Sequence, residues 1–134
     1  AEIITEKYLK SKNFKNFIYL GKPYDILCDD GKTELRVEVK GTKGTGHKVG
    51  ITRNEILHSR DEYSTKHNKN TKVILSIVNN IQTKLINNKW IANSGKLVHI
   101  DTMYFKEDIK KMFKNSRIKP LTFDFEIKNH EINL

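Results

Sequence analysis

A chain of 134 residues has room for one domain and is long enough to bury a core without disulfide bonds. Its formal net charge of +9 argues against an acidic disordered tail or a carrier of neutral small molecules. The charge favours a polyanionic partner, with nucleic acid ahead of an anionic membrane surface. Because only four of the 25 basic residues are Arg, the alternative of a solvated lysine-rich surface stays open.

The cysteine content and the hydropathy of the chain indicate where in the cell the protein should be found. Cys28 is the only cysteine, which excludes an intramolecular disulfide and a cysteine-rich zinc site. A lone thiol is typical of a reducing compartment, so we expect a cytoplasmic protein. No run approaches the roughly 18 apolar residues that a membrane span needs, so we expect no membrane partner. The first residue is not Met, which fits routine processing as well as excision from a larger protein.

Hydropathy patterns in the first part of the chain predict a helix followed by three strands. Residues 2–12 carry one apolar stripe at helical spacing. Residues 17–20 and 24–28 resemble short strands, and residues 34–40 alternate apolar and polar side chains cleanly. The Asp-Gly pair within residues 29–32 tolerates the positive φ of a tight turn, so the last two strands should form a hairpin.

A glycine-rich basic loop, residues 41–48, follows this hairpin and leads into a short strand at residues 49–51. Thr52 and Glu55 have the spacing of a capping box, so a helix should begin there and continue to about Tyr63.

The later elements are less regular. The predicted elements are an apolar strand at 71–78 that is covered on both faces, two strands near 90–91 and 97–100 around a turn at 93–95, a helix at about 103–114, and a half-buried strand at 121–128. We interpret Trp90 and the Phe residues from Phe105 to Phe125 as core side chains rather than base-stacking platforms.

One group of polar residues has the types and spacing of a hydrolytic site. Glu38 and Lys40 are two residues apart on a predicted strand, so they share a face, and Asp25 lies near the matching end of the neighbouring strand. Two carboxylates can hold Mg²⁺, which prefers one or two of them and keeps water in its other positions. A lysine ammonium can orient a water or neutralise charge on a phosphoryl group. Such a group can cleave a phosphodiester; the alternative is a solvated strand face with cross-strand charge pairs.

The same Glu-x-Lys spacing recurs at Glu126 and Lys128, where the only nearby acid is Asp124 on the same strand. Two such pairs are close to the number expected by chance for this composition. We interpret the second pair as a solvated strand face.

Residues after the hairpin are candidates for contacts with the nucleic-acid backbone. Arg53 and Asn54 begin a helix whose N-terminal amides can hold a phosphate. With Thr42, Lys43 and Lys48 they would contact DNA. The equally weighted alternative is that this helix start is only capped and that Arg53 is solvated.

Three segments together resemble a known family. Asp25, with Glu38 and Lys40 on the next strand, resembles the PD-(D/E)XK nuclease superfamily. The fuller likeness is to the Protein NO VEIN C-terminal domain family, through Tyr-Asp-Ile at 24–26, Glu-Val-Lys-Gly-Thr at 38–42 and Ile-Thr-Arg-Asn-Glu at 51–55. The likeness covers roughly residues 2–80.

The resemblance implies an α/β (α+β) fold with a restriction-endonuclease-like core, in which a mixed sheet is flanked by helices. Residues 1–134 would then be a single nuclease-like domain, itself a candidate piece of a larger protein. The implied activity is Mg²⁺-dependent endonucleolytic cleavage of DNA in a restriction or defence system, with Mn²⁺ as a substitute metal. Carried over by position, Asp25 and Glu38 would be metal ligands and Lys40 the catalytic lysine. Glu6 fits the place of a further carboxylate on the first helix; the alternative is an ordinary exposed helix residue.

Partners and the competing function follow from the same reasoning. Cutting both DNA strands usually needs two sites, so a homodimer or a partner nuclease is plausible. The sequence has no P-loop, so any helicase or ATPase, like any specificity subunit, would be another chain or a missing part of this one. The alternative function is a catalytically inactive nucleic-acid-binding or interaction domain with the same fold.

Overall fold

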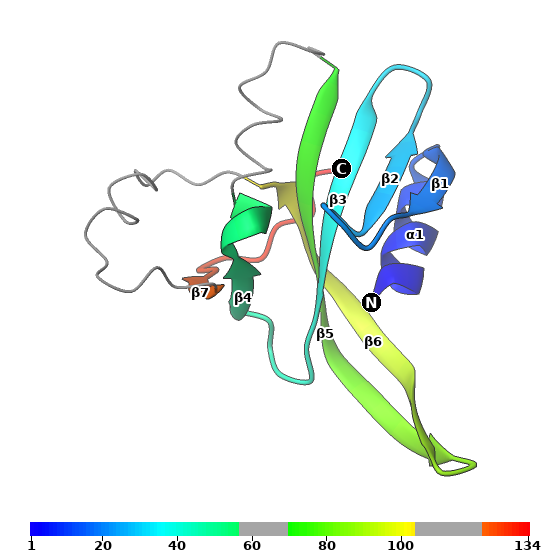
Figure 1. The fold of residues 1–134 in the computed structure, drawn as a ribbon, viewed down its shortest axis with the longest axis vertical. Helices are drawn as coiled ribbons and strands as arrows, with labels where there is room; N and C mark the ends of the chain where they lie inside the picture. Colours follow the sequence, from blue (N-terminus) through cyan, green and yellow to red (C-terminus); the bar gives the residue numbers. More distant parts are fainter. Residues whose placement is uncertain (57–69, 104–121) are drawn as a thin grey trace.

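The part of the chain that the structure describes contains helix α1, a helical segment at residues 53–56 and seven strands. The computed structural model describes residues 1–56, 70–103 and 122–134. In chain order the elements are α1 (Glu2–Ser11), β1 (Lys15–Tyr19), β2 (Ile26–Asp29), β3 (Glu34–Gly41), β4 (Lys48–Thr52), β5 (Thr71–Ile86), β6 (Lys89–Thr102) and β7 (Thr122–Glu126). Five strands form one sheet in the order β1-β2-β3-β5-β6, and β4 and β7 form a separate two-stranded sheet (Figure 1).

The larger sheet is mixed. β3 and β5 are parallel, whereas the other neighbouring pairs are antiparallel. The predicted α+β class with a mixed sheet is therefore confirmed, and so are the first helix, the hairpin at residues 29–32 and a strand in the predicted 121–128 segment.

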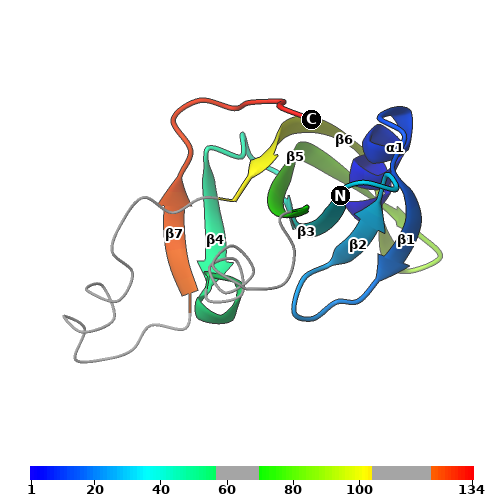
Figure 2. The ribbon, with the colours of Figure 1, turned by 90° about the horizontal axis from the view of Figure 1, so that it is seen from above.

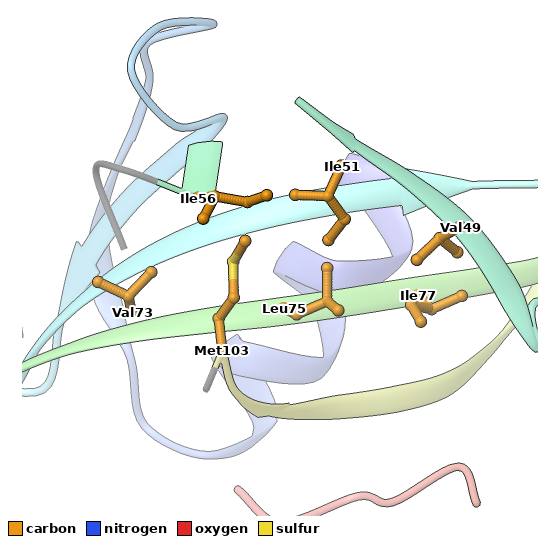
Figure 3. Packing of buried hydrophobic residues seen from close by; sticks show 7 residues of the cluster. All are labelled: Val49, Ile51, Ile56, Val73, Leu75, Ile77 and Met103. Carbon is orange, nitrogen blue, oxygen red and sulfur yellow. The ribbon is translucent and has the colours of Figure 1, made fainter. Parts of the chain in front are cut away.

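Different elements cover the two faces of the sheet (Figure 2). On one face, α1 buries Leu9 against a cluster of apolar strand residues. The Oγ1 atom of Thr5 lies 2.8 Å from Oγ of Ser76, a hydrogen bond that ties α1 to β5. On the other face, β4 and residues 53–56 pack on β5. The side chains of that cluster are Val49, Ile51, Ile56, Val73, Leu75, Ile77 and Met103 (Figure 3).

This arrangement explains the apolar run in β5. Alternate residues of a strand point to opposite faces, and here both faces are covered. Val73, Leu75 and Ile77 face β4, whereas Ile74 and Val78 lie on the α1 side with Ser76, and all are buried. The prediction of a strand covered on both faces is confirmed.

The predicted turn at residues 93–95 is wrong. β6 runs through these residues without a break, and the reversal occurs at Asn87 and Asn88, whose φ angles of 50° and 61° suit a tight hairpin turn. The Asn-Ser-Gly sequence looks like a turn, but Gly95 has another reason to be glycine. A Cβ atom there would lie 2.9 Å from Cγ1 of Val78.

The placement of Trp90 in the core is also wrong. Its side chain is 72% exposed near the end of the long β5–β6 hairpin, which projects beyond the body of the domain (Figure 1). Met103 is described and is not helical, whereas the rest of the predicted helix at 103–114 lies outside the described residues, as does the predicted helix beyond residue 56. The predicted core side chains Phe105, Phe113, Phe123 and Phe125 are likewise outside what the structure describes.

Among the residues that the structure describes, no helix has the length and apolar character needed to cross a membrane.

The two-sided burial of β5 gives a stability prediction. Ile74→Ala should lower the free energy of unfolding by about 2–5 kcal/mol, because it opens a cavity at a fully buried position in an interior strand of the sheet. Ile3→Ala is the matched control, since Ile3 is 80% exposed, and it should change stability by less than about 0.5 kcal/mol. Urea unfolding of both variants measures the difference; equal effects would contradict this packing.

Candidate active site

Asp25 directly precedes β2 and lies close to Glu38 on β3. The antiparallel register ends with Ile26 paired to Val37. The backbone N–H of Asp25 donates to the carbonyl of the same Val37 at 3.1 Å, so the pairing shifts by one residue here. The negative charge of Asp25 is near enough to Glu38 to raise the pKa of that carboxyl group.

The Asp25 carboxylate is fixed by the backbone of the partner strand. Its Oδ2 atom accepts a hydrogen bond of 2.7 Å from the N–H of Val39. A carboxylate held in this way does not need a further side chain to orient it.

Lys40 is held between two glutamates. It is two residues beyond Glu38 on β3, and its Nζ atom lies 2.8 Å from Oε1 of Glu38 and 2.9 Å from Oε2 of Glu55. We call Asp25, Glu38, Lys40 and Glu55 the carboxylate–lysine cluster.

Glu55 reaches this cluster through the predicted capping box, which is confirmed. The N–H of Thr52 donates to Oε2 of Glu55 at 2.8 Å, and the N–H of Glu55 donates to Oγ1 of Thr52 at 3.2 Å. The same Oε2 atom therefore accepts from both the cap and Lys40. The spacing of Thr52 and Glu55 predicted the cap. It could not predict the contact of Glu55 with Lys40, which depends on β4 packing over β3.

Burial makes ionisation of Glu38 unfavourable. Only 6% of the surface of this residue is exposed, and the loss of hydration on burial raises the pKa of its carboxyl group to about 8. Lys40 opposes this rise, while the negative charges of Asp25 and Glu55 add to it.

The two other members of the ion-pair network remain charged. Burial works against the ammonium of Lys40, but its hydrogen bonds to Glu38 and Glu55 outweigh this and raise its pKa. Burial likewise works against the charge on Glu55, yet the hydrogen bonds from Thr52 and Lys40 hold its pKa below the ordinary value. The cluster thus contains three carboxyl groups and one ammonium, and it has capacity for a further positive charge.

The chemistry of these donors fits a hard divalent cation. In the described part of the chain, no three His, Cys, Asp or Glu side chains are grouped so as to hold a metal ion. Mg²⁺ does not require such a group, because one or two carboxylates and several waters suffice. Asp25 and Glu38 are the residues that would hold it, and the added positive charge would offset the repulsion around Glu38.

Glu6 lies apart from the cluster. It forms an ion pair with Lys10 one turn along α1. Because α1 covers the face of the sheet opposite to Glu38 and Lys40, the structure does not bring Glu6 to these residues (Figure 2).

The predicted DNA-contacting residues all lie between Lys40 and Glu55 in the sequence. Lys43 is exposed in the loop after β3, and Lys48 is exposed at the start of β4. Oγ1 of Thr42 accepts a hydrogen bond of 3.1 Å from the N–H of Gly44 and so shapes that loop.

Two further predicted contacts directly precede Glu55. Arg53 is half-buried and Asn54 is exposed, both in the helical residues 53–56. They are therefore carried by the same short segment as the capping carboxylate.

The chain was compared with models of known protein families and with solved structures. The family model described as Protein NO VEIN, C-terminal, matches residues 2–90, which include every member of the carboxylate–lysine cluster. The chain belongs to the Protein NO VEIN C-terminal family. Among solved structures, this NO VEIN domain matches Hjc, a Holliday junction resolvase of Archaeoglobus fulgidus, with 17% sequence identity and a TM-score of 0.43 over 93% of this chain and 85% of that one. No curated protein sequence matches the chain.

The raised pKa of Glu38 in this NO VEIN domain gives a prediction about stability and pH. The ordinary pKa of 4.5 applies to the unfolded chain and about 8 to the folded one. The stability contributed by neutral Glu38 is therefore complete below pH 4.5 and is lost as the pH rises through about 8. In the presence of a chelator, Glu38→Gln should melt at a higher temperature than the wild type at pH 8, and this advantage should shrink at pH 5.

Thermal unfolding of both proteins across this range measures the effect. The matched control is Glu6→Gln, on the opposite face, which should show no advantage that grows with pH. A Glu38→Gln protein that is no more stable than the wild type at pH 8 would contradict the electrostatic description.

Proposed function

We propose that this domain is a metal-dependent endonuclease of the PD-(D/E)XK type, with a restriction-endonuclease-like core, that hydrolyses phosphodiester bonds in DNA. The observation that carries the proposal is the contact between Lys40 and Glu38 on β3, with the carboxylate of Asp25 held beside them by the N–H of Val39. Mg²⁺ is the proposed metal and Mn²⁺ its substitute.

Each residue of the cluster has a separate role in this proposal. Asp25 and Glu38 would hold the cation, which would polarise a phosphoryl oxygen and activate a bound water. Lys40 would place positive charge next to the reacting phosphate. Glu55 would act as a positioning residue, because its carboxylate anchors the Lys40 ammonium and is itself fixed by Thr52.

The proposed substrate is supported by charge. The net charge of +9 favours a polyanion, and the segment between Lys40 and Glu55 carries the candidate phosphate contacts Thr42, Lys43, Lys48, Arg53 and Asn54. We further propose that residues 1–134 act as the nuclease module of a cytoplasmic restriction or defence system. A homodimer, or a partner helicase, ATPase or specificity subunit, would complete that system.

A plasmid-cleavage assay tests the activity. With Mg²⁺ or Mn²⁺ the wild type should nick or linearise DNA, and Lys40→Ala, Glu38→Ala and Asp25→Ala should each lower the rate by at least about 100-fold, as expected when a group that stabilises the transition state is removed. Lys128→Ala is the matched control, because it removes the lysine of the exposed second Glu-x-Lys pair, and it should cleave normally.

Cleavage that survives in the cluster variants would overturn the assignment of the site. A wild type that binds DNA but does not cleave it with either metal would favour the inactive binding domain.

The role of Glu55 can be tested separately from that of the metal ligands. Glu55→Ala should lower kcat by about 10- to 100-fold while leaving KM for DNA nearly unchanged, because a displaced Lys40 affects the transition state more than binding. Glu55→Gln keeps one oxygen that can accept a hydrogen bond and should recover part of the rate. An effect on KM alone would instead indicate that Glu55 contributes to DNA binding.

A further inference from the structure

The outer part of the β5–β6 hairpin is a two-stranded arm that extends past the body of the domain (Figure 1). We call residues 80–96 the hairpin arm. Its strands pair from Gln82 with Ser94 to Ile86 with Lys89, and the turn at Asn87 and Asn88 closes it. No other described strand pairs with these residues, since β3 ends its pairing with β5 at Val78.

The root of the arm is attached to the loop that follows Lys40. The N–H of Thr42 donates to the Val78 carbonyl at 3.0 Å, the N–H of Ile81 donates to the Thr42 carbonyl at 3.0 Å, and the N–H of Asn80 donates to the Gly44 carbonyl at 3.1 Å. The arm is thus a continuation of the strands beside the cluster rather than a separate loop.

The end of the arm exposes large apolar side chains on both faces. Leu85 and Trp90 are directly opposite and share one face, whereas Ile86 and Ile91 lie on the other face together with Lys84 and Lys89. The exposed fractions are 52% for Leu85, 72% for Trp90, 42% for Ile86 and 46% for Ile91. Apolar side chains gathered at an exposed tip mark a binding surface.

The charge of the arm identifies the kind of partner. Residues 80–96 contain Lys84, Lys89 and Lys96 but no Asp or Glu. Lys is depleted in the cores of protein interfaces, whereas phosphates attract it. An exposed aromatic side chain can stack on bases or insert at a base step, and lysines on the other face of the same ribbon can reach the phosphates with their long side chains. The major groove of B-DNA also admits a two-stranded β-ribbon.

We propose that the hairpin arm is a DNA-binding β-ribbon, with Trp90 as its contact to bases and Lys84 and Lys89 as its contacts to phosphates. The position of the arm relative to cleavage rests on the proposed nuclease function. Lys40 is level with Ile77 on β5, and Trp90 is level with Leu85, eight residues further on. At about 3.3 Å per residue the separation along β5 is at most roughly 26 Å, or about eight base pairs of duplex, because the strand is irregular between Asn79 and Thr83.

Trp90 is the only tryptophan in the chain, so its fluorescence reports directly on the arm. A 30-base-pair duplex titrated into the full-length protein without divalent metal should quench and shift the emission of Trp90. The quenching should saturate at the same DNA concentration as the change in anisotropy of a labelled duplex. DNA binding seen by anisotropy without any change in tryptophan emission would overturn the proposal.

Substitutions separate the two kinds of contact. Trp90→Ala should raise Kd by about 10-fold, as expected for loss of one base-stacking side chain. Lys84→Ser with Lys89→Ser should lower the slope of log Kd against log salt by about 2. The matched controls are Ile3→Ala and Lys7→Ser, which change exposed residues on α1 and should leave Kd unchanged.

Two further readouts distinguish other outcomes. Sedimentation velocity of the wild type and Trp90→Ala should give the same oligomeric state; a change from dimer to monomer would mean that the arm binds a second copy and would overturn DNA binding by the arm. Lys40→Ala should retain the tryptophan quenching. If plasmid cleavage is never observed, the proposed nuclease function fails. If DNA still quenches Trp90 in the wild type and anisotropy shows weaker binding by Trp90→Ala, the binding role of the arm stands.

Discussion

The contact on which the candidate site depends is the ammonium of Lys40, held between Glu38 and Glu55. It joins β3 to the cap that follows β4, two segments that belong to different sheets. The ammonium partly compensates the two glutamates. Burial is the main cause of the raised pKa of Glu38, and the nearby charges of Asp25 and Glu55 add to it. A bound divalent cation would offset both contributions.

Packing on both sides of the sheet keeps this cluster in place. α1 closes one face through Leu9 and Thr5, and β4 closes the other through Val49 and Ile51. Because β5 is buried on both faces, β3 cannot shift its register against β5 without moving apolar side chains into polar surroundings. Side chains of β3 alternate between the two faces of the sheet, so Glu38 points away from the face that α1 covers. The same alternation explains why Glu6, carried by α1, lies apart from it.

The parts of the site that the sequence predicted are those set by short-range rules. The period of two places Glu38 and Lys40 on one face of β3, the Asp-Gly turn brings Asp25 near them, and the capping box places Glu55 next to Thr52. The contact between Glu55 and Lys40 could not be predicted in this way, since it depends on how β4 packs over β3. The hairpin arm was missed for a different reason. Gly95 looks like part of a turn but is required by close contact with Val78, and Trp90 has the hydropathy of a core residue while lying at an exposed tip.

The cluster and the arm are parts of one sheet, since β3 carries the former and its neighbour β5 extends into the latter. Binding of a divalent cation by Asp25 and Glu38 is the central claim, and anomalous diffraction from crystals of the full chain soaked in Mn²⁺ tests it most directly. A manganese peak in contact with both carboxylates, lost in Glu38→Gln crystals, is the predicted result. Manganese density elsewhere in the protein, with Lys40 still paired to Glu38 and no peak beside Asp25, would contradict it.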